Sequence, residues 1–115
     1  MTNNHELMEA FSERLKQVRN AASLSQQGMA DRMLIPKRTI EKWETGERTP
    51  PEYVQRFVLL ELVTLVPEDE QLEAQLKSGV YSDNDIIASQ FMKGKTIEEI
   101  NREIEREKER LKVRQ

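Results

Sequence analysis

The sequence contains no cysteine and only one histidine, His5. The lack of cysteine excludes disulfide bonds, thiolate nucleophiles and cysteine-ligated zinc or iron–sulfur sites. A lone histidine is a poor basis for a Ser–His–Asp triad or a zinc site. The chain also lacks a glycine-rich phosphate-binding loop. We therefore expect no metal ion, no cofactor and no enzymatic activity.

Long apolar runs are missing too. The longest, "FVLLELVTLV" at residues 57–66, contains Glu61. It is shorter than the roughly 20 residues that cross a bilayer. The first residues, "MTNNHELMEAF", show no basic stretch followed by an apolar one, as a secretory signal would. These features predict a cytoplasmic protein with no membrane partner, and they assign residues 57–66 to a buried helix.

Aromatic residues make up only 5% of the chain, whereas charged residues make up 34% and apolar residues 37%. Over 115 residues, this composition supports one modest core beneath a strongly solvated surface. The apolar residues recur at helical spacing, and no stretch alternates with a period of two. The predicted fold class is therefore all-α.

Two parts of different character meet at Pro67. Residues 1–66 hold nine basic and nine acidic residues, and residues 67–115 hold nine and twelve, so the net charge of −3 belongs to the second part. The helices expected in the first part span residues 5–22, 25–33, 36–44 and 52–65. Ser25 is their clearest N-cap and Gly46 their clearest C-cap. We predict one domain at residues 1–66 and an acidic helical region at residues 67–115.

Three more helices are expected in the second part. "PEDEQLEAQLKSG" forms a short acidic helix that Gly79 ends. "SDNDIIASQFMKG" follows, with Asp83 and Asn84 as N-cap candidates. The last helix opens with Thr96 and Glu99 in capping-box register. This part is thus predicted to be a helical appendage.

The stretch "PKRTIEKWET", from Pro36 to Thr45, has two different sides when it is placed on a helix at about 100° per residue. One side is apolar and carries Pro36, Ile40 and Trp43, with Glu44 at its edge. The other side is mostly basic and carries Lys37, Arg38, Glu41, Lys42 and Thr45. A short helix braced on its apolar side by the preceding helix is the arrangement of a helix-turn-helix. Its basic side fits the major groove of double-stranded DNA, where Arg and Lys reach guanine O6 and N7.

The combined motifs resemble the phage repressor and Cro family, also called the XRE family, over about residues 10–65. "SQQGMADRM" is similar to the second helix of that family. "IPKRTIEKWETGERTPP" is similar to its recognition helix and to the turn that follows. The resemblance implies a compact four- to five-helix domain that binds specific DNA sequences.

Carried over by position, the resemblance assigns roles to single residues. Gln26, at the start of the second helix, would bond a backbone phosphate. Thr39 would touch sugar–phosphate, and three residues would face base edges, namely Lys37, Arg38 and Lys42. The resemblance also implies a partly buried ion pair between Arg19 and Glu44. Trp43 is expected to pack in the core rather than to stack on a base.

The sequence departs from the family in two places. The turn before the recognition helix holds Leu34 where the family usually has glycine. Because positive φ is costly for leucine, we expect that turn to be built differently or to be longer. Glu41 and Glu47 bring negative charge close to DNA. Either could read a cytosine amino group or bias against wrong sites.

The last helix carries an apolar stripe made of Ile97, Ile100, Ile104 and Leu111. Glu107 interrupts this stripe, so a long coiled coil is not expected. We favour a helical hairpin for self-association as the role of residues 67–115. Two alternatives remain: simple packing on the first domain, or a second DNA-binding unit at "SQFMKGKTIEEI". The predicted function is a transcriptional regulator, most simply a dimeric repressor. The alternative is an antitoxin or adaptor whose C-terminal helices cover a protein partner.

Overall fold

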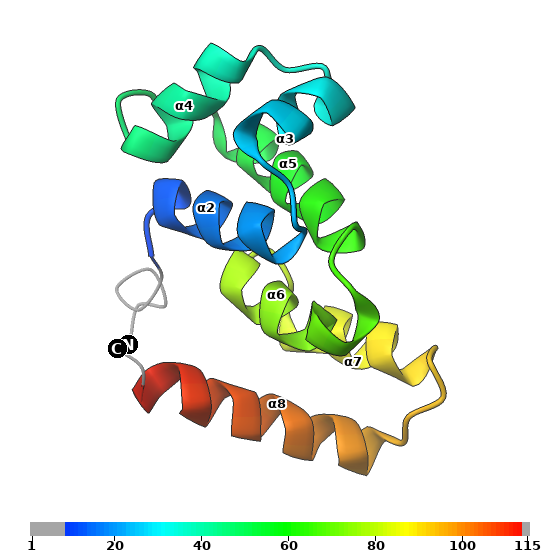
Figure 1. The fold of residues 1–115 in the computed structure, drawn as a ribbon. Coiled ribbons are helices and arrows are strands. Elements are labelled where there is room, and N and C mark those ends of the chain that lie inside the picture. Colours follow the sequence, from blue (N-terminus) through cyan, green and yellow to red (C-terminus); the bar gives the residue numbers. More distant parts are fainter. Residues whose placement is uncertain (1–8, 114–115) are drawn as a thin grey trace.

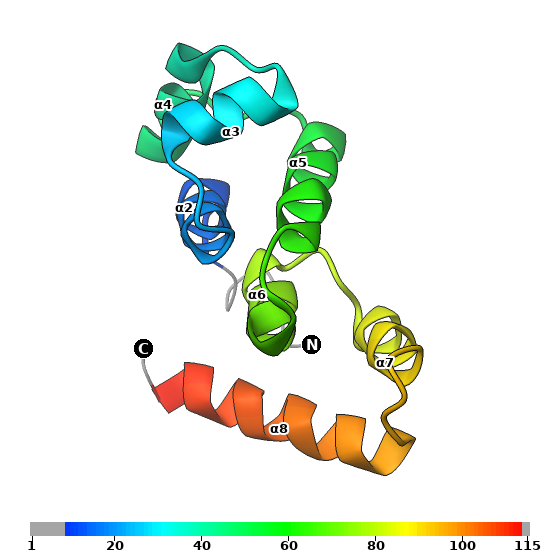
Figure 2. The same ribbon diagram turned by 45° about the vertical axis from the view of Figure 1, so that its right-hand side comes forward.

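The computed structural model describes residues 9–113, and its regular elements are all helical (Figure 1). They are α2 Phe11–Ala21, α3 Gln26–Met33, α4 Lys37–Thr45, α5 Glu52–Thr64, the 3₁₀ turn η1 Glu68–Glu70, α6 Gln71–Ser78, α7 Asp83–Phe91 and α8 Ile97–Val113. Residues 9–113 contain no strand, which confirms the all-α prediction. Figures 1 and 2 show α2 to α5 at one end of the molecule, α8 along the other end, and α6 between them.

The first described helix is shorter than expected. Its N-cap is Ala10, which has a ψ of 155°, and Glu9 and Ala10 are not helical. The predicted continuous helix over residues 5–22 is therefore wrong at residues 9 and 10, while residues 5–8, with His5, lie outside the described range. The extended Ala10 leaves the Glu9 carbonyl free to accept a hydrogen bond from Arg14 Nε at 3.0 Å. At Glu9 the Arg14 side chain thus provides the hydrogen bond that a backbone amide would provide in a continuing helix.

Most of the predicted helix ends are confirmed. Ser25 Oγ accepts a hydrogen bond from the Gly28 amide at 2.9 Å. Thr96 Oγ1 accepts one from the Glu99 amide at 3.2 Å, and the Glu99 carboxylate accepts one from the Thr96 amide at 3.0 Å. Gly46 takes a left-handed φ of 80° at the end of α4, a conformation that glycine adopts without strain.

The cap of α7 differs from the prediction. Ser82, rather than Asp83 or Asn84, is the N-cap, and its Oγ accepts from the Asp85 amide at 3.1 Å. The Asp85 carboxylate accepts from the Ser82 amide at 3.1 Å, which completes a capping box. The hydrogen bond from the Ser82 amide, followed by interaction with the Ser82 side chain, lowers the pKa of the Asp85 carboxyl group. Ser82 is the N-cap because its spacing to Asp85 allows the amides of both residues to be hydrogen-bonded at once.

The main core is formed by the four helices α2, α3, α4 and α5 together with Ala74 of α6. It is built on residues that are less than 10% exposed, chiefly Leu15, Val18, Met29, Ile40, Leu59 and Leu62. The expected buried helix at residues 57–66 is present, although Phe57 is 66% exposed. Ala74 of α6 belongs to the same core, so the core continues past Pro67. No helix within residues 9–113 is long and apolar enough to cross a membrane.

A second, smaller core joins α7 and α8 to α6. Ile86, Ile100 and Ile104 form its centre, and each is at most 3% exposed. Two members of the predicted apolar stripe are therefore used inside the chain, whereas Ile97 is 51% exposed. Because α6 and α7 cover the centre of the stripe, Ile100 and Ile104 do not lie on a surface that is open to self-association.

Arg14 connects α2 to the end of α6. From α2, its Nη1 donates a hydrogen bond to the Ser78 carbonyl at 2.9 Å, at the end of α6. Burial is the main reason that the pKa of Arg14 is lowered, and the charges of Glu52 and Glu9 oppose that effect. Because the partly buried guanidinium of Arg14 bonds this carbonyl in place of water, it fixes α6 against α2.

Candidate nucleic-acid interface

The turn between α3 and α4 has the ordinary short geometry. Leu34 takes a left-handed conformation, with φ 57° and ψ 42°, and it is 89% exposed. The Ile35 amide donates to the Ala30 carbonyl at 3.2 Å, which closes the end of α3. The prediction of a longer or differently built turn is wrong. The open space around Leu34 avoids a clash, so only the backbone strain remains, about 1–2 kcal/mol.

The inner side of α4 is anchored by apolar contacts. Ile40 is fully buried, and Trp43 packs its ring edge-on against Phe11, with ring centroids 6.0 Å apart. The expected core role of Trp43 is thus confirmed. Pro36 is exposed instead, because it precedes the first helical residue as the N-cap and does not follow the helical projection.

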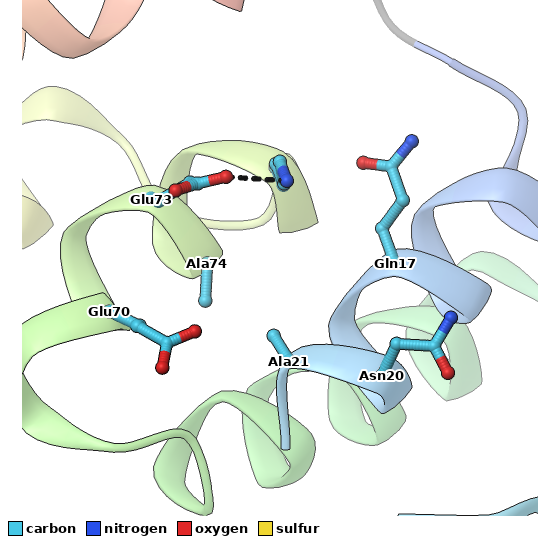
Figure 3. A pocket seen from close by; sticks show the side chains of 7 residues that line it. Gln17, Asn20, Ala21, Glu70, Glu73 and Ala74 are labelled. Atoms are coloured by element: carbon cyan, nitrogen blue, oxygen red, sulfur yellow. Dashed lines mark ion pairs between the residues drawn. The ribbon is translucent and has the colours of Figure 1, made fainter. Parts of the chain in front are cut away.

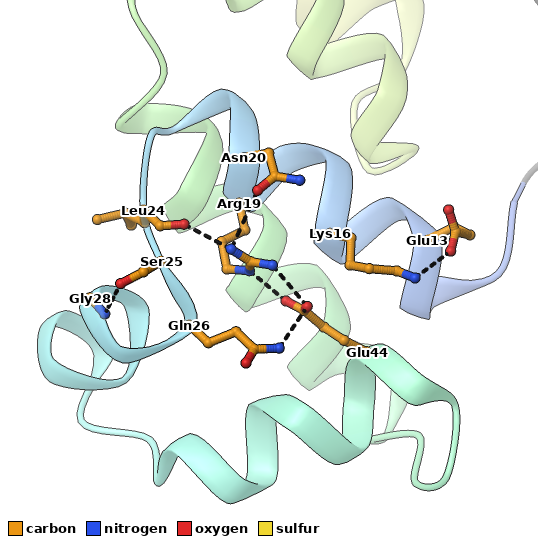
Figure 4. Close-up of polar contacts among 9 residues, drawn as sticks. All are labelled: Glu13, Lys16, Arg19, Asn20, Leu24, Ser25, Gln26, Gly28 and Glu44. Carbon is orange, nitrogen blue, oxygen red and sulfur yellow. Dashed lines mark hydrogen bonds and ion pairs between the residues drawn. The ribbon is translucent and has the colours of Figure 1, made fainter.

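The structure also joins Arg19 to Glu44 (Figure 4). Arg19 Nε and Nη2 donate to the two carboxylate oxygens at 2.6 and 2.9 Å. The Arg19 side chain is 12% exposed and the Glu44 side chain 4%. Arg19 Nη1 also donates to the Leu24 carbonyl at 2.9 Å. This bidentate pair holds the C-terminal end of α4 against α2 and against the start of the α3 segment.

Gln26 has a partner that the sequence did not suggest. Its Nε2 donates to Glu44 Oε1 at 3.0 Å, so Glu44 accepts hydrogen bonds from both Arg19 and Gln26 (Figure 4). Gln26 and Glu44 are 18 residues apart, and no local pattern links them. The contact orients the Gln26 side chain at the N-terminus of α3, beside the α4 helix.

The outer side of α4 is solvent-facing. Lys37 and Arg38 are exposed, and within residues 9–113 neither side chain forms a hydrogen bond or an ion pair. Lys42 and Thr39 are half-buried at the edges of this side. Lys42 Nζ lies 3.9 Å from the carboxylate of Glu47, in the loop after α4. The unpaired cations Lys37 and Arg38 are therefore free to meet an anionic ligand.

A separate pocket of about 350 Å³ lies between α2 and α6 (Figure 3). Its polar lining includes Gln17, Asn20, Glu70 and Glu73. Glu73 Oε2 lies 2.6 Å from Lys77 Nζ, and hydrogen bonds from Lys77 and Arg110 lower its pKa. Among the described residues, no group of three His, Asp or Glu side chains could hold a metal ion. The pocket is lined by no residue of α4 and is not part of the basic surface.

The sequence model of a helix-turn-helix domain matches residues 10–74, more than half of the chain. The matched range contains α2 to α5 and extends into α6. No curated protein and no solved structure matches the chain.

Proposed function

Because the chain belongs to the helix-turn-helix domain family, we propose that it is a sequence-specific DNA-binding regulator of the repressor and Cro type. In this proposal α4 enters the major groove. The supporting observation is the outer side of α4, where Lys37 and Arg38 stand exposed and unpaired in the described structure. Their helix is held from behind by Ile40, Trp43 and Glu44. A rigid helix that presents free cations is suited to guanine edges.

The remaining site residues divide into two roles. Lys42, at the edge of the basic side, joins Lys37 and Arg38 as a base-reading candidate. Gln26 and Thr39 are proposed to position the helix on sugar and phosphate. The Gln26 amide nitrogen carries two hydrogens, and one of them is bonded to Glu44. The second hydrogen is the donor proposed for a phosphate oxygen.

We further propose that the chain acts as a dimer and represses transcription by occupying a promoter. One helix-turn-helix contacts one half-site, and a dimer places two recognition helices about 34 Å apart. Residues 1–66 are proposed as the DNA-binding part and residues 67–115 as the dimerisation part. The second part carries the whole net charge of −3, so DNA phosphates would repel it. Among its described residues, the large apolar side chains that are more than half exposed flank the α7–α8 turn: Phe91 at 55%, Met92 at 85% and Ile97 at 51%.

The same three side chains also support the alternative function. An antitoxin or adaptor would use the exposed residues of the α7–α8 turn to cover a protein partner. The net negative charge of residues 67–115 as a whole favours a basic partner. Co-purification of a small basic protein with the full chain would favour this alternative over a homodimer.

Selection of bound sites from random double-stranded DNA tests the proposal. The full chain should enrich an inverted repeat whose half-sites lie about one helical turn apart. Binding to that site should weaken steeply as salt rises, because cations on the protein displace counterions from phosphates. Failure to enrich any motif would reject the regulator. A single unrepeated half-site would leave DNA binding intact and reject the dimer.

A further inference from the structure

Three glutamates lie at or near the recognition helix, and the structure separates them. Glu44 is buried and accepts hydrogen bonds from Arg19 and Gln26, so it is a structural residue. Glu47 lies past the end of α4, 64% exposed, within 3.9 Å of Lys42. Glu41 is exposed on α4 itself, and its carboxylate has no hydrogen bond or ion pair among the described residues. Only Glu41 combines a free carboxylate with a place on the outer side of the helix.

Glu41 also lies near the middle of that side. At about 100° per residue, it projects about 40° from Lys37 and about 60° from Arg38, between the two. Lys42 lies about 100° away from Glu41, at the edge of the exposed side. When a helix lies in the major groove, the middle of its outward side faces the base edges. The two flanks of that side face the phosphates. Glu41 is thus placed over bases, away from the phosphates that would repel it.

The base edges offer a carboxylate few partners. An ionised carboxylate can only accept hydrogen bonds. In the major groove, guanine presents N7 and O6 acceptors and thymine presents O4, so both leave a carboxylate unpaired. Adenine offers its N6 donor, but the N7 acceptor beside it repels a second oxygen. Cytosine offers its N4 amino group without an adjacent acceptor on the same base.

We propose that Glu41 is a specificity-determining residue that accepts a hydrogen bond from cytosine N4 in each half-site. This inference rests on the proposed function, because it requires α4 to enter the major groove. A wrong base would leave the Glu41 carboxylate desolvated and unpaired, which costs about 10- to 100-fold in affinity for a well-placed base contact. Glu41 therefore lowers affinity for every site that lacks cytosine at this position.

The Glu41→Gln variant gives the clearest test, because it removes the charge and keeps the shape. A glutamine amide both donates and accepts, which suits the paired N7 and N6 of adenine. Site selection with the full chain should therefore change one position of each half-site from cytosine to adenine. Glu41→Ala should lose the cytosine preference without gaining adenine. Glu105→Gln makes the same charge change at an exposed position of α8, and its selected motif should match that of the wild type.

A modified base tests whether the cytosine N4 hydrogen donates to Glu41. In a cytosine–guanine pair, one N4 hydrogen bonds to guanine and the other points into the major groove. N4-methylcytosine puts a methyl group in place of that second hydrogen and keeps the base pair. Wild-type protein should bind the selected duplex about 10-fold more weakly when the cytosine carries this methyl group, measured by fluorescence anisotropy at fixed salt. The Glu41→Ala protein should be insensitive to the methyl group.

The outcomes separate the two proposals. A wild-type chain that selects no motif overturns the proposed function and this inference with it. A wild-type chain that selects a motif which Glu41→Gln leaves unchanged overturns only the role of Glu41, as does tolerance of N4-methylcytosine by the wild type. Helical circular dichroism of each variant checks that the fold is retained.

Discussion

Removing Arg19 or Glu44 should destabilise the protein strongly, because their ion pair is almost fully buried from solvent. The pair has two hydrogen bonds, of 2.6 and 2.9 Å, with 12% and 4% of the side chains exposed. Breaking a buried pair leaves the other charge without compensation, which typically costs about 3–5 kcal/mol. In Arg19→Ala, Glu44 keeps only the hydrogen bond from Gln26. In Glu44→Ala, Arg19 keeps the Leu24 carbonyl and reaches water more readily.

These contacts order the variants by free energy of unfolding. We expect a loss of about 3 kcal/mol for Arg19→Ala, at the lower end of the range for buried pairs. Glu44→Ala should lose less, about 2 kcal/mol, because Arg19 keeps its hydrogen bond to the Leu24 carbonyl and is reached by water. The double variant should lose about 3 kcal/mol, less than the sum of the single losses, because no charge is left stranded. For a chain of this size, about 3 kcal/mol lowers Tm by roughly 10–15 °C.

Urea denaturation of the four proteins measures the coupling energy directly. Lys16 and Glu13 serve as the matched control, since their ion pair is 2.7 Å long but its side chains are 41% and 49% exposed. That exposed pair should couple by less than about 1 kcal/mol. Additive losses at Arg19 and Glu44, within about 0.5 kcal/mol, would refute the reasoning that a dry ion pair anchors α4.

Three further changes have defined outcomes. Leu34→Gly should raise the free energy of unfolding in urea by up to about 1 kcal/mol, since glycine relieves the left-handed strain but loses more entropy on folding; destabilisation would contradict the strain. The lowered pKa of Glu73 contributes stability above its unfolded pKa of about 4.3, lost as pH falls through the folded value. Glu73→Gln should therefore lose less Tm than the wild type as the pH falls below that value. The same decline of Tm with pH in both proteins would argue against the contacts of Glu73 with its cationic neighbours. Replacing Phe91 and Met92 by serine should give a monomer in sedimentation, and wild-type sedimentation as a monomer would reject the dimer.

Local features of the fold could be predicted from the sequence. Ser25 and Gly46 mark helix ends through contacts within a few residues, so their roles follow from residue type and position. The two sides of α4 follow from helical spacing alone, because Ile40 and Trp43 must be buried together. Prediction works at these positions because the deciding interactions lie within one or two helical turns.

The α3–α4 turn shows the opposite situation. Local energetics disfavour a leucine with positive φ, and the expected longer turn followed from that fact alone. The structure keeps the short turn and leaves Leu34 strained and exposed. Packing of Met29 and Ile40 in the common core outweighs a local cost of about 1–2 kcal/mol. Tertiary contacts of this kind do not appear in a local pattern.

Partners that are distant in sequence were also missed. The spacing of Ile100 and Ile104 predicts that one side of α8 is buried, but it does not say against what, and the structure uses them inside the chain. The hydrogen bond from Gln26 to Glu44 has no sequence signature either. The Arg19–Glu44 contact was expected only through the family resemblance, because 25 residues separate the two.

The central claim is that the outer side of α4 reads DNA, and Arg38 tests it most directly. Affinity of the full chain for its selected site should be compared at one salt concentration with that of Arg38→Ala and of Arg106→Ala, an exposed arginine on α8. Arg38→Ala should lose about 1–3 kcal/mol of binding and relax preference at one base pair, whereas Arg106→Ala should bind like the wild type. Equal effects of the two substitutions, or an Arg38→Ala protein with unchanged affinity and motif, would contradict the account.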